Sequence, residues 1–123
     1  MKRRTLLVLL GLSLAACGRA DKARQKFEAV QAGQAEMDLR RALGDPRAMI
    51  VREYIGDRMV HVDLRNGRQT LLADDPASWP PHAKSLPRRK IENKVLIYES
   101  GDVTAYYFMD GFGEITFASV HGG

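Results

Sequence analysis

The order of the periodic segments in this chain predicts an α+β fold in which two N-terminal helices pack on an antiparallel sheet. Apolar residues recur three or four positions apart before residue 46, whereas apolar and polar residues alternate over most segments after it. Helices followed by a run of strands with short turns are typical of this fold class. The length of 123 residues supports one domain, which we expect to span residues 23–123.

The two helices are predicted over residues 23–31 and 35–43. Apolar side chains at helical spacing give each helix one apolar face. These residues are Phe27 and Val30 in the first helix and Leu39 and Leu43 in the second. Gly44 is a favourable C-terminal cap, and Pro46 is a stop signal, so the second helix has a well-defined end.

Six strands are predicted after the helices, with an extra hairpin in the first half of the sheet. Their ranges are 49–55, 59–65, 68–72, 94–99, 103–109 and 114–120. Asn66-Gly67 is the strongest two-residue hairpin signal in the chain and pairs the second strand with the third. On the second strand, apolar residues alternate with His61 and Asp63. We expect these two on the solvated face rather than in a metal or acid–base site.

Three consecutive aromatic residues, at positions 106–108, are a candidate recognition surface on the fifth predicted strand. Side chains alternate between the two faces of a strand, so one set must lie in the core. At most half of this aromatic run is therefore available to a partner.

Residues 74–93 form a predicted Pro-rich basic loop between the two groups of strands. This range holds four of the five prolines, and five basic residues stand against one acidic residue between positions 80 and 94. Trp79, which two prolines follow, is expected to be an exposed and rigid apolar anchor. The neighbouring cations can meet an acidic protein face or anionic lipid headgroups. These candidate partner-binding cations are Arg88, Arg89 and Lys90. The alternative interpretation is a solvated loop whose charges maintain solubility.

The first residues have the pattern of a secretory signal peptide, which we assign to residues 1–16. A cationic segment precedes an apolar run that is too short to span a bilayer, which takes about 20 residues. The run ends in a small-residue tripeptide directly before Cys17 and resembles the lipobox of bacterial lipoproteins. The resemblance implies cleavage before Cys17, lipid attachment to its thiol and a lipidated tether over residues 17–22. Gly18 stands where lipoproteins of the inner membrane usually carry Asp, which implies the outer membrane, on its periplasmic side.

The charge distribution argues against nucleic-acid binding. The net charge is +4, but residues 2–4 supply most of the excess, and the chain from Cys17 onward is nearly neutral. One cysteine and three histidines do not form any usual zinc-site spacing. No nucleophile elbow or phosphate-binding glycine loop occurs in the sequence. We therefore expect no catalytic residues, no metal and no cofactor.

A segment around the second predicted helix is similar to the helix-turn signature of the SmpA/OmlA (BamE-like) lipoprotein family. The matching residues are Gly33, Leu39, Leu43, Gly44 and Pro46. The family's later strands carry an aromatic-rich segment, a turn with Gly and a final hydrophobic strand, and residues 106–117 are similar. Family members usually have Ser or Thr where Ala35 stands, and the missing side-chain N-cap weakens the helix start by about 1 kcal/mol. The family's sheet is three-stranded, so residues 48–93 are an extra hairpin plus the basic loop.

The resemblance implies a non-enzymatic outer-membrane lipoprotein that binds protein partners in envelope or β-barrel outer-membrane protein assembly. Its expected partners are the membrane, through the lipid anchor, an envelope protein such as the β-barrel assembly machine, and anionic lipid. An alternative of another class is a lipid-anchored inhibitor or immunity protein that caps an enzyme or toxin in the periplasm. The inhibitor would have a soluble partner and would tolerate loss of the anchor, whereas the assembly protein would depend on Cys17.

Overall fold

The computed structural model describes residues 15–122, and their side chains from Ala20 onward. Residues 1–14 of the predicted signal peptide lie outside the described residues, and so does the side chain of the predicted lipidation site, Cys17. The described residues form an α+β fold with an open, six-stranded antiparallel sheet, which confirms the predicted fold class.

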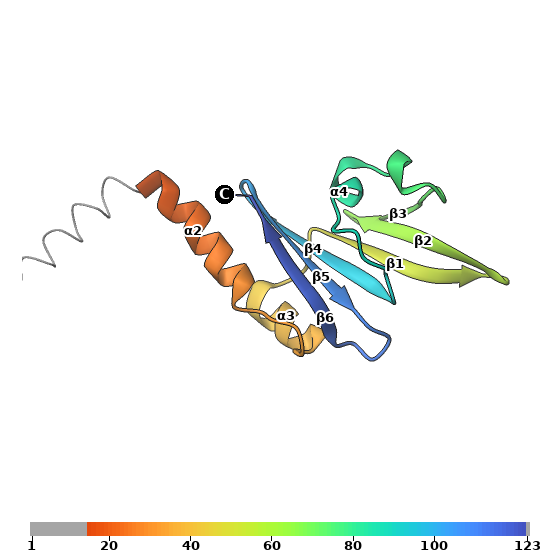
Figure 1. Ribbon diagram of the computed structural model, residues 1–123, viewed down its shortest axis with the longest axis horizontal. Helices are drawn as coiled ribbons and strands as arrows, with labels where there is room; N and C mark the ends of the chain where they lie inside the picture. Colours follow the sequence, from red (N-terminus) through yellow and green to blue (C-terminus); the bar gives the residue numbers. More distant parts are fainter. Residues whose placement is uncertain (1–14, 123) are drawn as a thin grey trace, which may run out of the picture.

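The six strands match the predicted strands to within one residue at each end. They are β1 (Ala48–Ile55), β2 (Arg58–Arg65), β3 (Arg68–Leu71), β4 (Lys94–Ser100), β5 (Val103–Met109) and β6 (Ile115–His121). Their order across the sheet is β3-β2-β1-β4-β5-β6, and every neighbouring pair is antiparallel (Figure 1). Asn66 and Gly67 have positive φ angles of 53° and 74°, which confirms the predicted tight turn between β2 and β3.

Helix α2 (Ala15–Glu28) begins earlier than predicted and includes residues 17–22, which we expected to form a tether. The helix contains four Ala, two Lys and two Arg, which are strong helix formers. Arg24 and Glu28 add an i, i+4 ion pair of 3.1 Å. The helix contacts β5 and β6, and its N-terminal end projects beyond the sheet (Figure 1).

Helix α3 (Glu36–Leu43) lies where it was predicted. Ala35 occupies the N-cap position without a side-chain hydrogen bond, and the Asp38 carboxylate accepts a hydrogen bond of 3.3 Å from the Ala35 backbone N–H. At the other end, Gly44 has a φ of 79°, and its N–H donates to the Arg40 carbonyl oxygen at 2.7 Å. The glycine that the sequence indicated as a C-terminal cap therefore closes the helix.

Both faces of the central strands are covered, so the middle of the sheet is buried on two sides. One face packs with Phe27 of α2 and Leu39 of α3. The hydroxyl of Tyr107 on this face donates to the Phe27 carbonyl oxygen at 2.6 Å. Tyr106 and Phe108 belong to a second core cluster on the opposite face. The whole aromatic run is therefore buried and offers no recognition surface.

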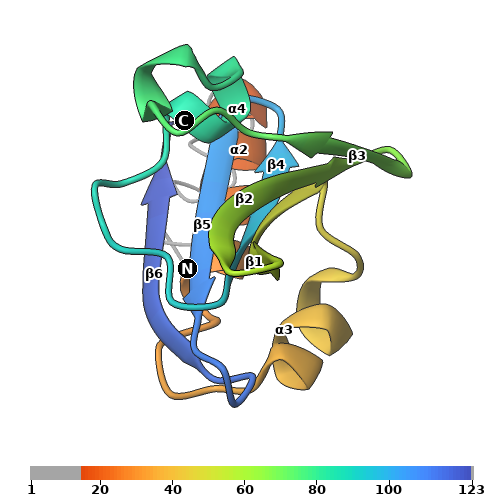
Figure 2. The same cartoon turned by 90° about the vertical axis from the view of Figure 1, so that its right-hand side faces the viewer.

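The segment 74–93, which we expected to be an irregular loop, covers the second face of the sheet (Figure 2). It contains the 3-10 helix η1 (Pro76–Ser78) and the short helix α4 (Pro81–Lys84), each of which starts at a proline. Ala83 and Ile91 are 2% and 7% exposed and pack in one cluster with Ile50 of β1. The Pro-rich segment is thus part of the core of the domain.

Candidate functional site

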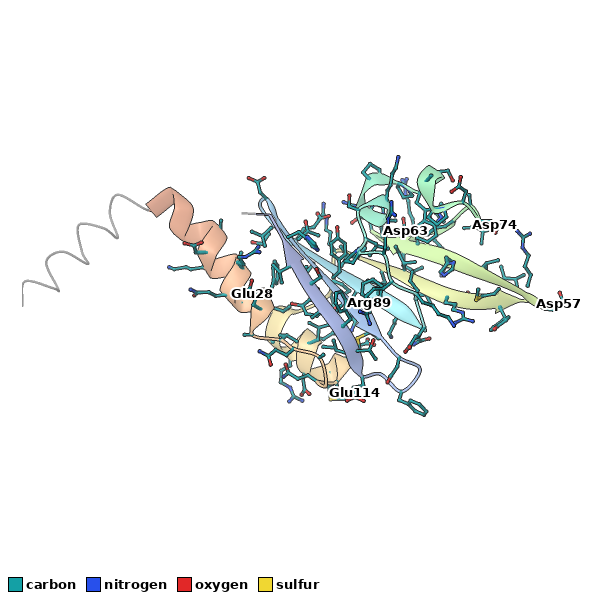
Figure 3. All side chains as sticks on the ribbon, viewed as in Figure 1. Glu28, Asp57, Asp63, Asp74, Arg89 and Glu114 are labelled. Atoms are coloured by element: carbon teal, nitrogen blue, oxygen red, sulfur yellow. The ribbon has the colours of Figure 1, made fainter. Side chains whose placement is uncertain are left out.

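A groove of about 750 Å³ opens between the 74–93 segment and the arm formed by β1 and β2. We call it the basic groove. Its polar and aromatic lining residues include Arg52, His61, Trp79, Arg88, Arg89 and Lys90. Arg89 and Asp74, which also lines the groove, are labelled in Figure 3. The fold therefore brings the four predicted partner-binding residues to one concave surface, together with two residues that the sequence analysis did not assign to it.

Trp79 forms a wall of the groove and is half-buried, not freely exposed as we expected. Its indole N–H donates to the Ala73 carbonyl oxygen at 2.7 Å. Its ring lies 5.5 Å from the His61 ring, centroid to centroid, with the planes tilted by 53°. These contacts hold the indole in one orientation. A preorganised aromatic surface loses little conformational entropy when a ligand covers it.

Arg52 and His61 enter the groove because they face each other across the β1–β2 ladder. Burial lowers the pKa of His61, and the nearby Arg52 guanidinium lowers it further. His61 is therefore neutral at pH 7 and presents an aromatic surface rather than a charge. The sequence could have predicted that Arg52 and His61 lie opposite each other. A two-residue turn at Gly56 and Asp57 sets the register of β1 and β2, and this register pairs the two residues.

We expected Asp63 on the solvated face of the sheet, and this expectation was wrong, because Asp63 is buried. Its Oδ2 atom lies 2.8 Å from Nε2 of His82 in α4, and the two side chains are only 7% and 11% exposed. The Asp63 Oδ1 atom has no hydrogen-bond partner within residues 15–122. This contact joins α4 to β2 and so holds the 74–93 segment, with its groove, against the sheet. His82 and His61 have different partners, and the described residues contain no group of three potential metal ligands.

The three predicted cations of the groove are exposed, and none makes an ion pair within the described part of the chain. The Arg89 guanidinium lies 4.1 Å from the centroid of the Phe117 ring, which orients it without neutralising it. Arg88 and Lys90 flank it in the sequence. Positive charge therefore gathers at this end of the groove with no internal counterion, and an anionic group is its natural complement.

The acidic residues that line the groove have internal partners. Asp74 pairs with Arg58 at 2.7 Å. The Asp75 carboxylate accepts a hydrogen bond of 3.0 Å from the Ala77 N–H and caps η1. The groove therefore combines hydrogen-bonded carboxylates, unpaired cations and an aromatic wall.

Comparisons with protein-family models, with curated proteins and with solved structures found no match. The resemblance to SmpA/OmlA lipoproteins and the lipidation of Cys17 stay predictions. Within residues 15–122, no helix combines the length and the hydrophobicity that crossing a membrane requires.

Proposed function

We propose that this chain is a non-enzymatic lipoprotein, anchored through Cys17 on the periplasmic side of the outer membrane. In this proposal the basic groove binds an acidic segment of an envelope protein during envelope or β-barrel outer-membrane protein assembly. The likeness of this helix packing to that of BamE-like proteins is part of the same proposal. The observation that carries it is the cluster of unpaired cations beside a fixed aromatic wall.

The chemistry of the groove specifies the kind of segment that fits. Arg88, Arg89 and Lys90 offer charge-assisted hydrogen bonds to carboxylates. Trp79 and the neutral His61 ring offer an apolar surface beside them. Aromatic residues and Arg are the side chains that most often dominate binding energy at interfaces. An acidic segment that also carries an apolar side chain satisfies both parts of the groove.

The position of the proposed anchor supports this arrangement. An anchor at Cys17 would join the membrane to the projecting N-terminal end of α2, and the 74–93 segment lies at the opposite end of the protein (Figure 1). The groove would then be held away from the lipid surface, where a periplasmic partner has access to it. This geometry favours a protein partner over lipid headgroups of the same membrane.

Affinity purification of the tagged chain from detergent-solubilised envelopes tests the proposal. The wild type is compared with Trp79→Ala/Arg88→Ala/Arg89→Ala, and the matched control is Met37→Ala/Arg41→Ala/Arg68→Ala, which removes exposed residues elsewhere. We expect β-barrel assembly subunits with the wild type and the control, and their loss with the groove variant. Equal recovery with all three chains would contradict the role of the groove. A single soluble enzyme or toxin in their place would favour the inhibitor alternative.

Lipid binding needs a separate measurement, because anionic headgroups carry the same charge as carboxylates. Flotation of the Cys17→Ser chain with vesicles that contain or lack anionic phospholipid measures it without the anchor. Our proposal predicts that the groove cations do not bind the vesicles. The chain with the intact groove and the groove variant should therefore float to the same extent, whether or not the vesicles contain anionic phospholipid. Flotation that depends on both the anionic lipid and the groove cations would assign the groove to the membrane surface.

A further inference from the structure

The turn between β5 and β6 presents an apolar side chain to solvent. Phe112 is 97% exposed, more than any other large hydrophobic side chain of residues 20–122. The Asp110 carboxylate accepts hydrogen bonds from the backbone N–H groups of Phe112, at 2.9 Å, and Glu114, at 3.0 Å. The backbone of the turn is therefore held by the Asp110 side chain, which keeps the exposed ring at the tip of the turn.

The surroundings of this ring are acidic. Asp110 and Glu114 flank Phe112, and a bridge between Ala35 and Glu114 brings the start of α3, with Asp38, to the same place. None of the three carboxylates makes an ion pair among the residues that the structure describes. We call Phe112 and these three acids the acidic tip. Its complement is an apolar pocket with cations around it.

The basic groove of the same protein has that chemistry. It combines apolar and aromatic walls with free cations, and its volume of about 750 Å³ lies in the range of binding pockets, about 300–1,000 Å³. The tip cannot fold back into the groove of its own chain, because Ile115 is hydrogen-bonded to Gln34 at 2.8 Å and Gly33 to Ile115 at 2.7 Å. Figure 3 shows Glu114 at the lower edge of the molecule and Asp74, which lines the groove, at the upper right, with the groove residue Arg89 between them. A contact between tip and groove thus requires two copies.

We propose that this protein self-associates head to tail, with Phe112 of one copy in the basic groove of the next and the acids of the tip against Arg88 and Lys90. The two surfaces are different, so the contact does not close in a dimer and continues into rings or chains. This self-association uses the same groove as the proposed function, but it does not depend on the identity of the envelope partner. Its consequence is that self-association and partner binding exclude each other.

Sedimentation of the full chain in detergent over a range of concentrations tests the proposal. Two variants each remove one side of the contact. Phe112→Ser removes the ring, and Arg88→Glu/Lys90→Glu reverses two groove charges while it leaves the Arg89–Phe117 contact intact. We expect species larger than a dimer for the wild type and self-association weaker by roughly 30-fold for each variant. An equimolar mixture of the two variants retains one good tip and one good groove and should form a dimer that does not grow further.

The matched controls are Leu71→Ser, at a β3 side chain that is 60% exposed, and Arg41→Glu/Arg68→Glu, outside the groove. Both should behave as the wild type. A wild type that stays monomeric, variants that associate as the wild type does, or a variant mixture that stays monomeric would each overturn the proposal. Phe112→Ser removes the tip but leaves the groove intact. Purification with this variant therefore tests whether the groove captures the envelope partner, independently of self-association.

Discussion

Substitution of His82 by alanine perturbs the buried contact that holds the 74–93 segment to the sheet. The Asp63 side chain is 7% exposed, its Oδ2 atom has His82 as partner at 2.8 Å, and its Oδ1 atom has none among the described residues. His82→Ala therefore leaves a buried carboxylate without a protein partner. Such a loss costs about 3–5 kcal/mol in the free energy of unfolding. We expect about 3 kcal/mol, the lower end, because His82 is 11% exposed and water can enter the vacated space.

Urea unfolding measures this loss with two independent signals. Circular dichroism follows the whole domain, and fluorescence follows Trp79, the only tryptophan of the chain, which lies within the 74–93 segment. Because that segment is part of the core, both transitions should move together to lower urea concentration. The control Arg41→Ala removes an exposed side chain of α3 that has no ion pair within residues 20–122 and should change stability by no more than about 0.5 kcal/mol. A loss below about 1 kcal/mol for His82→Ala would refute the dependence of Asp63 on His82.

Three further substitutions test other parts of the core in the same urea assay. Leu39→Ala, at a fully buried position of α3, should cost about 2–5 kcal/mol, and a neutral result would contradict the packing of α3 in the core. Tyr107→Phe leaves the buried Phe27 carbonyl oxygen without its donor and should cost about 1–3 kcal/mol, so an unchanged midpoint would argue against this hydrogen bond. Burial raises the pKa of Tyr98 from 10.0 to about 12, so the unfolded chain ionises first as the pH rises. Tyr98 should therefore lower stability by about 2–3 kcal/mol between these two pKa values, in addition to the losses from Tyr106 and Tyr107, whose pKa values burial also raises, and Tyr98→Phe should show a correspondingly smaller decline.

The groove and the acidic tip differ in how far local sequence could predict them. The basic composition and the tryptophan of residues 74–93 identified a candidate contact surface directly. Nothing local indicated that Trp79 packs against His61, because the two residues lie on separate segments that meet only in the folded domain. Phe112 belongs to a Gly-Phe-Gly turn that we treated as a connection, and its functional interest comes from an exposure that only the structure reports.

Helix and strand positions were determined by the sequence itself. Alternation of apolar residues set the limits of the six strands, and Asn66-Gly67 set one hairpin register. Gly44 marked the end of α3. These features depend on hydrogen bonds and side-chain spacing within a few residues, so the local sequence contains the information that they need. The start of α2 was the exception, since the helix begins at Ala15 rather than at residue 23.

The tertiary structure alone decided what covers each face of the sheet. Alternation placed Asp63 and Tyr106 opposite their apolar neighbours, but it could not show that a second layer buries both. That layer is the 74–93 segment, in which apolar residues have no regular spacing. It packs on the sheet through contacts with residues distant in the sequence, such as the contact between His82 and Asp63. Periodicity determines the direction in which a side chain points. Its burial, and with it the shape and charge of the groove, depends on which distant segment packs over it.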